Sequence, residues 1–540
     1  MIKYLFLVFG FLLFTVNLMG QVWAPPGVNT RPSSDTFIYD IGINQYNGDT
    51  YLYLAPGLNM NFNNWGFSFQ LPVNILAHDA APKMPDSKVG KIRSIDYDSK
   101  SDYQRVLNFI WFGNYGVYKP KEITYSLYLG KMHDGYIGHG TIVNRYVNNQ
   151  RVDLYKLGVM ADLNTDYGGV QVFTNAIYDR DVNAGRGYVR PFGILFGIMD
   201  IASGKRDLAM LAGNVLDDVG RKKVNEEITS SKEEERYVEI ETDPVTGQKR
   251  EVEKVAPKKE RTIPKDEPSE SNRIFDLRRF ALGYTSAYDA RAPTSLDLDT
   301  TGNIRYDNAN NAKVKSVRRQ GVEGYDAEFK VISTAMFELT PYGDYNRIKN
   351  VPNAMGRHYG VIMKVGGKDI NLTIRPEYRS MTSNYIPMYF DSYYEIERYQ
   401  VNLDSSFPYT KYEYLQNKPV DGPAVKGYFH TVILNIYRIG FEANYEDYTG
   451  SNNSRVFVGA YIPVASILRF SAFYIKKGFD KSGEAFKVDD RSQGAAELAI
   501  NLGPVTIRAQ NRRRWVLDSE TNQFKAKDEQ MLLFSGGTAF

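Results

Sequence analysis

The most regular feature of the chain is an alternation of apolar and polar side chains, with a period of two residues, in segments of about ten residues. In the segment 370–379, Ile370 and Leu372 lie on one face, and Arg375, Glu377 and Arg379 lie on the other. Successive side chains of a strand point to opposite faces, so this period indicates β-strands. The same pattern predicts further strands at 37–46, 50–62, 65–76, 103–112, 123–130, 154–163, 169–177, 278–287, 327–339, 357–365, 427–437, 439–445, 455–462, 468–476, 494–502, 505–510 and 528–540.

Short glycine-marked turns separate many of these segments, and long polar stretches separate the others. The turns at 366–369 and 502–504 are examples of the first kind. Glycine tolerates the positive φ angles that tight hairpins need. The long polar stretches are 77–102, 143–152, 217–273, 288–325, 380–425 and 477–493. Short turns at one end and long polar loops at the other are typical of a transmembrane β-barrel.

A soluble β-sandwich would show the same alternation, so the strands alone do not decide between the two. Beyond the N-terminal region the nearest candidate for an apolar helical span, 194–201, is too short to cross a membrane. If the mature chain spans a membrane, it does so as strands. We therefore predict an all-β fold, with a single transmembrane antiparallel β-barrel over residues 36–540. We expect about 16 to 18 strands, within a range of roughly 14 to 20.

The N-terminus has the three parts of a secretory signal peptide. Lys3 precedes an apolar run from Tyr4 to Val16, and Gly20 supplies a small residue for cleavage. We predict a signal peptide at 1–20, with cleavage after Ala24 as the second choice, and an N-terminal extension at 21–35. The alternative is a membrane anchor, for which the apolar run is short.

The largest polar stretch, 217–273, is rich in charged residues and has a single aromatic residue, Tyr237. It cannot bury enough apolar surface to offset the entropy lost on ordering, so we predict a charged, disordered insert within the barrel. A short hairpin over 237–252 is an alternative for its centre. The sequence does not indicate which side of the membrane the insert occupies.

Composition excludes several classes of site. The chain has no cysteine, so it has no disulfide, thiolate zinc site or cysteine nucleophile. Its formal net charge is only +3, which gives no reason to expect nucleic acid as a partner.

The last strand, 530–540, resembles the C-terminal signature of bacterial outer-membrane barrels, which end on an aromatic residue after an alternating strand. Here that residue is Phe540, whereas Gly536 and Thr538 depart from the apolar residues usual in the signature. The resemblance implies an outer-membrane location, contact with outer-membrane lipid, and insertion by the barrel-assembly machinery with Phe540 as the signal.

Three further segments, 138–144, 186–191 and 389–395, resemble uncharacterised predicted outer-membrane barrel proteins. This second resemblance implies a barrel and brings no known activity.

Two groups of polar residues could hold a metal ion. His133, Asp134 and His139 are suitable zinc ligands, but the surrounding glycines favour a packed turn. The segment 297–304 resembles the start of an EF-hand calcium loop, but Asn308 stands where the bidentate Glu should be, which favours a polar surface loop. No Ser-His motif is recognisable. We therefore predict no metal, no cofactor and no enzymatic activity.

Charged residues recur on the polar strand faces and are candidates to line a lumen. They could create a positive field that favours anionic solutes, or form an Arg–Glu ladder that fills the interior, which is the favoured interpretation. The candidates are Arg375, Glu377, Arg379, Arg508, Arg512, Arg438 and Glu442.

The tyrosine-rich, acidic segment around 385–399 is a second candidate region, with Tyr389, Asp391, Tyr393 and Glu395 at its centre. It could fold inward as a constriction or stack on sugar rings. An interfacial aromatic girdle or a self-packed external loop is the favoured interpretation.

These features predict a porin-like passive channel for small hydrophilic solutes, because a barrel of this size has room for water. The alternative is a non-conducting surface barrel whose loops bind a partner or matrix. A third hypothesis is a soluble secreted β protein. The solute and the oligomeric state do not follow from the sequence.

Overall fold

The computed structural model describes residues 35–539 except 47, 63, 81–88, 94–95, 99, 101, 114–123, 151–154, 179, 204–235, 243–248, 256–273, 307–311, 368, 402–407, 465–466, 504 and 519–522. The predicted signal peptide, the extension up to residue 34 and the predicted assembly signal Phe540 lie outside the described residues. The chain divides into two units, the first made of residues 1–193 and 274–540 and the second of residues 194–273.

The first half of the first unit contains β1 (Thr36–Tyr46), β2 (Asp49–Asn61), β3 (Trp65–Gln70), β4 (Val73–His78), the 3₁₀ helix η2 (Asp102–Val106), β5 (Leu107–Gly113), β6 (Thr124–Gly130), β7 (Gly158–Asn164), β8 (Gly168–Thr174) and β9 (Val182–Val189). The second half contains η4 (Leu277–Arg279), β12 (Phe280–Leu296), β13 (Val314–Phe329), β14 (Ile332–Ser333), β15 (Phe337–Ile348), β16 (Met355–Gly366), β17 (Ile370–Met381), α4 (Tyr394–Glu397), α5 (Lys411–Gln416), β18 (Val425–Ile436), β19 (Ile439–Tyr448), β20 (Ser454–Val464), β21 (Leu468–Phe479), η5 (Ser482–Glu484), β22 (Ser492–Asn501), β23 (Val505–Asp518) and β24 (Gln523–Ala539).

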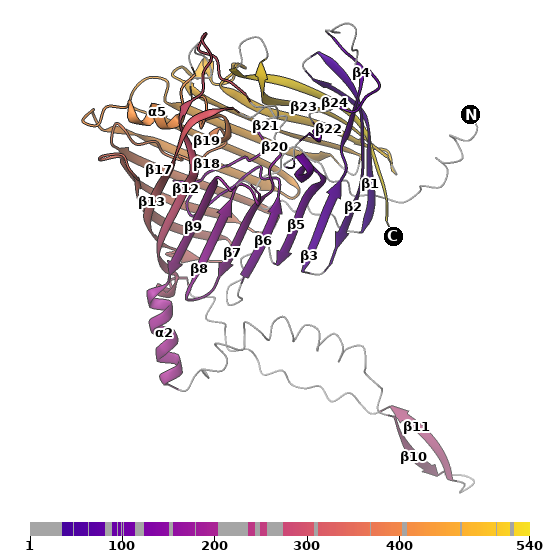
Figure 1. Ribbon diagram of the computed structural model, residues 1–540. Helices are drawn as coiled ribbons and strands as arrows, with labels where there is room; N and C mark the ends of the chain where they lie inside the picture. The colour runs from indigo at the N-terminus through magenta and orange to yellow at the C-terminus, as the bar shows by residue number, and fades with distance from the viewer. Residues whose placement is uncertain are drawn as a thin grey trace, which may run out of the picture. The chain divides into compact units, whose positions relative to one another are not determined.

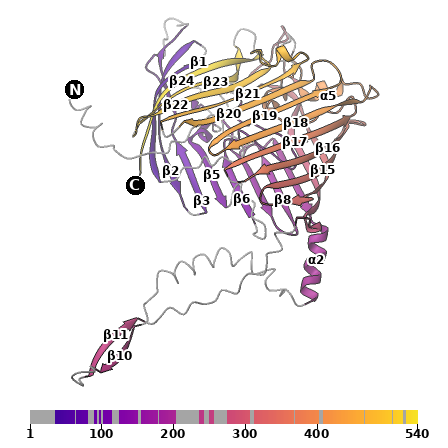
Figure 2. The ribbon, with the colours of Figure 1, turned by 180° about the vertical axis from the view of Figure 1, so that it is seen from behind.

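These strands form one closed antiparallel β-barrel (Figure 1). The strands pair in chain order around the barrel, except that β2 pairs with both β3 and β4, β15 pairs with both β13 and β14, and β9 pairs with β12. β1 pairs with both β2 and β24, which closes the sheet. In the closing pair Thr36 lies opposite Ala539 and Tyr46 lies opposite Glu529. Seen from behind in Figure 2, β15 to β24 form the opposite wall from β3 to β9. The predicted all-β, single-barrel fold is confirmed.

The barrel has 20 strands among the residues described, because β3 and β4 run along one partner strand, as do β13 and β14. This is the upper end of the predicted range and exceeds the expected 16 to 18. Two strands escaped the pattern. On its outward face β9 has two glycines, so the alternation of side chains is lost there. In β13 the adjacent polar residues Arg318 and Arg319 interrupt the alternation, so most of this strand was included in the predicted polar loop. The predicted strand 327–339 instead spans the connection between β13 and β15.

The connections alternate in length around the barrel. One end has short links, such as the two-residue turn between β18 and β19, where Tyr437 has a φ of 53°. The other end has the long links 79–106, 131–157, 297–313 and 382–424. We call these the short-turn end and the long-loop end. β9 ends and β12 begins at the short-turn end, so the chain leaves the barrel there before the charged insert.

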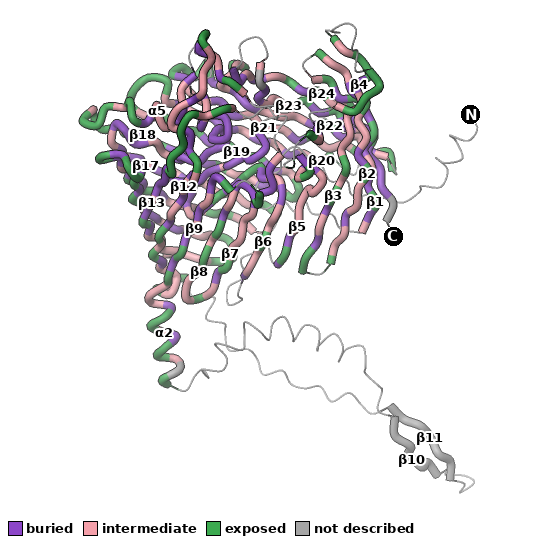
Figure 3. The backbone as a smooth tube through the Cα atoms, viewed as in Figure 1, coloured by how far each residue is buried: buried purple, intermediate pink, exposed green. Residues whose placement is uncertain are grey.

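Strand β1 shows an alternation that is inverted relative to a soluble protein. In β1 the polar Asp40 and Asn44 are buried, whereas Phe37, Ile41 and Ile43 are 56%, 46% and 47% exposed. Figure 3 shows buried and exposed positions alternating along the wall strands, with buried segments gathered inside the barrel. An apolar outer face over a polar inner face is the arrangement of a transmembrane barrel.

The second unit contains most of helix α2 (Pro191–Ala202), which begins in the first unit, and the hairpin of β10 (Arg236–Thr242) with β11 (Lys249–Val255). Proline is favoured at the first position of a helix because it has no N–H to leave unpaired. The hairpin pairs Arg236 with Val255 and Thr242 with Lys249, in the region where a hairpin was the alternative interpretation. The rest of the predicted 217–273 insert lies outside the described residues. Among the residues the structure does describe, helices long and apolar enough to span a bilayer are absent.

Candidate functional site: the barrel interior

The inward face of β17 carries three of the predicted charged residues as a ladder. Glu377 lies between Arg375, at 2.7 Å, and Arg379, at 2.5 Å. Arg379 also pairs with Glu446 of β19 at 3.1 Å, and Glu446 pairs with Arg455 of β20 at 3.0 Å. This network of alternating charges crosses the wall because residues on one face of adjacent strands lie side by side. These residues therefore pair with one another as alternating charges, and their role in lining a lumen stays a prediction.

The other predicted wall residues differ in position. Arg508 is buried on the inward face of β23 and bonds Glu497 of β22 at 3.1 Å. Glu442 is buried on β19 and pairs with Arg145. Arg512 shares the inward face of β23 with Arg508 and is half-buried. Arg438 is different, because β18 ends at Ile436 and β19 begins at Ile439. Its assignment to the lumen is wrong: it is exposed in the turn at the short-turn end, where the strand alternation no longer applies.

Two connections from the long-loop end fold into the barrel. We call residues 131–150 the first inner segment and residues 382–400 the second inner segment. The two segments pair with each other through backbone hydrogen bonds. The N–H of Asn144 donates to the carbonyl of Phe390 at 3.1 Å, and the N–H of Phe390 donates to the carbonyl of Ile142 at 3.1 Å. Their apolar side chains form one buried cluster with inward-facing wall residues such as Val322 and Phe173. The interior is therefore narrowed by the chain's own loops.

His139 fastens the first inner segment to the wall. Its Nδ1 lies 2.8 Å from an oxygen of Asp344 and its Nε2 lies 3.0 Å from Glu328, and its ring stacks on Tyr342. Although burial opposes the charged form, the carboxylates of Asp344 and Glu328 raise the pKa of His139 to about 9. The imidazolium is therefore the prevailing form at neutral pH, and it donates to both carboxylates.

Two glycines give the first inner segment its sharp shape. Gly138 and Gly140 have φ angles of 57° and 72°, in the left-handed region that favours glycine. A Cβ on Gly140 would lie 2.5 Å from the ring of Tyr136, whose hydroxyl accepts a 2.6 Å bond from Arg375. The Gly-His-Gly sequence thus turns the chain so that His139 reaches the wall.

Glu395 joins the two inner segments. It accepts hydrogen bonds from Lys156 at 2.7 Å and from Asn175 at 2.9 Å, and it also contacts the Tyr146 hydroxyl. Against the effect of burial, the ammonium of Lys156 and the guanidinium of Arg398 lower the pKa of Glu395. The carboxylate is therefore held in its charged form at the centre of the interior.

The remaining predicted residues of the second inner segment are also buried against the wall. Asp391 pairs with Arg455 at 2.7 Å, which extends the ladder into the segment. The Tyr393 hydroxyl donates to the carbonyl of Ile475 at 3.1 Å. Tyr389 is 1% exposed within the apolar cluster. The favoured external interpretation of this tyrosine-rich region is therefore wrong, because its hydroxyls and carboxylates find their partners inside the barrel.

Sequence reasoning missed Lys156 and Arg398, which hold the second inner segment in place. Arg398 bonds Asp181 at 2.8 Å and Asp289 at 3.0 Å. One signal could have indicated that the wall is covered on its inner side: Val322 puts an apolar side chain on a face of β13 that also carries Gln320 and Asp326. Inward apolar residues need an apolar partner, and the inner segments supply it.

A different part of the interior carries cations in excess. Lys131 and Arg512 are half-buried, and among the described residues neither has a carboxylate at ion-pair distance. Burial, and to a smaller extent the guanidiniums of Arg512, Arg105 and Arg514, lower the pKa of Lys131 to about 8. On the first inner segment, His133 is exposed and Tyr136 is 39% exposed. Lys131 and Arg512 are thus like-charged neighbours close to His133, an exposed side chain of the first inner segment.

Both segments considered as metal sites contain side chains that bond within the protein. The ring nitrogens of His139 are occupied by Asp344 and Glu328, and the part of the chain that the structure describes holds no group of three or more His, Asp or Glu able to hold a metal. In the segment 297–304, one oxygen of Asp299 accepts from the backbone of Thr301 at 2.8 Å and of Asn303 at 2.9 Å. This is a side-chain-stabilised turn.

Comparison with known proteins gave matches among solved structures alone, since no family model and no curated protein matches the chain. OccK5 (OpdH) of Pseudomonas aeruginosa is 9% identical over 94% of this chain and 98% of that chain, with a TM-score of 0.29. The outer membrane protein OpdK of the same organism is 8% identical over 94% and 99%, with a TM-score of 0.28. OccAB3 of Acinetobacter baumannii is 10% identical over 94% and 98%, with a TM-score of 0.27. With TM-scores this low, nothing is carried over from these proteins.

Proposed function

We propose that the chain is a porin-like channel of the outer membrane that passes small hydrophilic solutes and favours anions. The observation that carries the proposal is the pair of half-buried cations, Lys131 and Arg512, on the inner side of a closed barrel with an apolar outer face. A positive field in a low-dielectric passage raises the local concentration of anions. The inner segments narrow the passage and bring solutes close to these side chains.

The barrel size agrees with a narrowed channel. Barrels of about 16 to 18 strands leave an aqueous channel, whereas those of about 22 strands have a plugged lumen. With 20 strands, this barrel would leave a wide passage if its loops pointed outward. The two inner segments occupy part of that space, which supports small solutes over large ones.

The test is single-channel conductance in planar bilayers, with the reversal potential measured across a potassium chloride gradient. We expect a small conductance that is selective for anions. In Arg512→Gln the reversal potential should move toward the value expected for a cation-selective channel. Arg513→Gln is the matched control, because Arg513 is the next residue on β23, faces outward and pairs with Asp528. Arg512→Gln and Arg513→Gln behaving alike would overturn the anion preference. Absence of conductance would instead favour a non-conducting surface barrel.

A further inference from the structure

The outward face of β12, β13 and β15 carries a row of tyrosines. Tyr284 lies opposite Tyr325, and Tyr325 lies opposite Tyr345. Their exposed fractions are 39%, 60% and 38%, so the rings face away from the interior. Rows of tyrosine at one height on a barrel mark the boundary between the apolar and polar layers of a membrane.

A charged group follows the tyrosine row, two residues closer to the long-loop end. Glu323 accepts a 3.1 Å bond from the Tyr284 hydroxyl and pairs with Arg347 at 2.6 Å and Lys349 at 2.7 Å. The tyrosine hydroxyl thus points toward the charged group and away from the middle of the strands. This order, apolar then tyrosine then charge, is that of a membrane–water interface.

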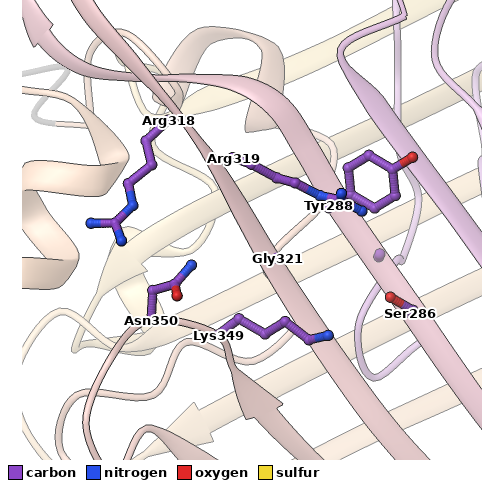
Figure 4. Close-up of a pocket in the computed structure, with 8 residues that line it drawn as sticks. Ser286, Tyr288, Arg318, Arg319, Gly321, Lys349 and Asn350 are labelled. Carbon is purple, nitrogen blue, oxygen red and sulfur yellow. The ribbon is translucent and has the colours of Figure 1, made fainter.

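A pocket of about 430 Å³ opens beside this charged group. Its lining includes Ser286 and Tyr288 of β12, Arg319 and Gly321 of β13, and Lys349, which comes directly after β15. Figure 4 shows the Arg319 and Lys349 side chains extending toward the side occupied by Tyr288 and Ser286, whereas Arg318 extends away. The Arg319 guanidinium lies 3.8 Å from the centre of the Tyr288 ring.

The backbone fixes the floor of the pocket. Gly321 contributes no side chain, and its carbonyl accepts a 2.8 Å bond from the N–H of Lys349. That bond sets the position from which the Lys349 side chain crosses the floor. The cavity therefore depends on strand pairing as well as on flexible side chains.

The charges around this pocket do not balance. Arg319, Arg347 and Lys349 bring three cations, and Glu323 is shared by two of them. Within the described residues, Arg319 has no carboxylate at ion-pair distance, and its guanidinium lies over the Tyr288 ring. An arginine held by a ring, with its guanidinium edge free to donate, can form paired hydrogen bonds to a phosphate.

We propose that this pocket binds the phosphate-bearing headgroup of an anionic membrane lipid. Its place just beyond the tyrosine row is where a lipid phosphate lies, and basic pockets at that height bind lipid headgroups. Below the tyrosines, Leu282 lies opposite Ala327, which lies opposite Gly343. These small or apolar side chains leave an outward strip on which acyl chains can pack. The site rests on the membrane location proposed above and is independent of conduction.

The experiment places the full-length barrel in phosphatidylcholine nanodiscs doped with phosphatidylglycerol and counts retained lipids by native mass spectrometry. We expect retention of phosphatidylglycerol over phosphatidylcholine, and a roughly tenfold loss of affinity in Arg319→Gln, because one charge-assisted contact is removed. Lys426→Gln is the matched control. Lys426 is exposed on the outward side of β18 near the long-loop end, and it does not line the pocket.

Three outcomes would overturn the proposal: equal retention of the two lipids, an equal effect of Arg319→Gln and Lys426→Gln, or full displacement of the lipid by inorganic phosphate, which would mean a free-anion site. If Arg319→Gln does not fold, Ser286→Leu replaces it, since a leucine would fill the pocket from β12 and keep every charge. Heat-modifiable gel mobility reports folding, and nanodisc insertion reports the membrane location. A barrel that inserts and retains the lipid but does not conduct would refute the channel and leave the lipid site standing.

Discussion

Glu377 is the residue on which the charge balance of the inner wall depends most directly. Its side chain has no exposed surface and lies between two guanidiniums, those of Arg375 and Arg379. In Glu377→Gln both arginines keep their charges in a buried place, so we expect the free energy of unfolding to fall by about 3 to 5 kcal/mol. The measurement is urea unfolding in detergent micelles.

Glu338→Gln is the control for that measurement. Glu338 also lies between two cations, Lys330 and Lys364, each at 3.4 Å, but its side chain is 26% exposed. Water screens such a pair, and we expect a loss of no more than about 1 kcal/mol. Equal losses in the two variants would show that Glu377 is not buried as described.

The charge of His139 makes the docking of the first inner segment dependent on pH. The folded pKa of about 9 lies above the ordinary histidine value of 6.5, because Asp344 and Glu328 hold the imidazolium against the cost of burial. The stabilisation is therefore complete below about 6.5 and is lost as the pH rises through about 9. We expect the melting temperature to fall across that interval, and His139→Gln to remove this part of the pH dependence. A wild-type melting temperature that is constant from neutral pH to beyond about 9 would contradict this prediction.

The backbone path of the first inner segment depends on Gly140. Gly140 has a φ of 72°, and a Cβ added to it would lie 2.5 Å from the Tyr136 ring. The substitution Gly140→Ala therefore combines backbone strain with a steric clash. We expect a loss of about 1 to 3 kcal/mol, and faster hydrogen exchange over 131–150. Gly187→Ala is the control, since a Cβ on Gly187 meets nothing within 4 Å. Its effect should stay within about 0.5 kcal/mol.

Most strands followed from the two-residue period, because an apolar outer face and a polar inner face leave a readable alternation. The period failed where a strand lacks contrast. In β9, Gly185 and Gly187 leave outward positions without side chains, and in β13 the adjacent Arg318 and Arg319 hide the change of face. The turn residue Arg438 was misplaced for the opposite reason, since an alternating pattern was extended past the end of its strand.

The candidate site was only partly predictable, for a physical reason. The sequence shows which charges share a strand face, so the group of Arg375, Glu377 and Arg379 could be found. It does not show which loops fold inward, because an inward loop and an outward loop can have the same composition. Asp391 and Arg455 are far apart in the chain and meet only when the second inner segment enters the barrel.

For the whole molecule, the barrel and its inner segments depend on each other. The wall exposes apolar side chains such as Val322 to the interior, and the inner segments cover them. The inner segments carry charges such as Glu395, which need partners on the chain around them. A closed sheet is what holds these partners at fixed positions, so closure between β1 and β24 is the condition for the rest of the interior.

Closure can be tested directly because the chain has no cysteine, so an introduced pair can form one disulfide within the chain. Ile41 lies opposite Phe534 in the closing pair, and both side chains face outward. Opposed residues of antiparallel strands have Cα atoms about 4.5 to 5.5 Å apart, which suits a disulfide. We expect Ile41→Cys with Phe534→Cys to cross-link under mild oxidation, as measured by thiol titration and peptide mass spectrometry. Ile41→Cys with Gln530→Cys is the control, because Gln530 lies opposite Gln45, about 13 Å further along the strand. A cross-link in the control pair, or its absence in the opposed pair, would refute this register, and with it the closed wall on which the interior is built.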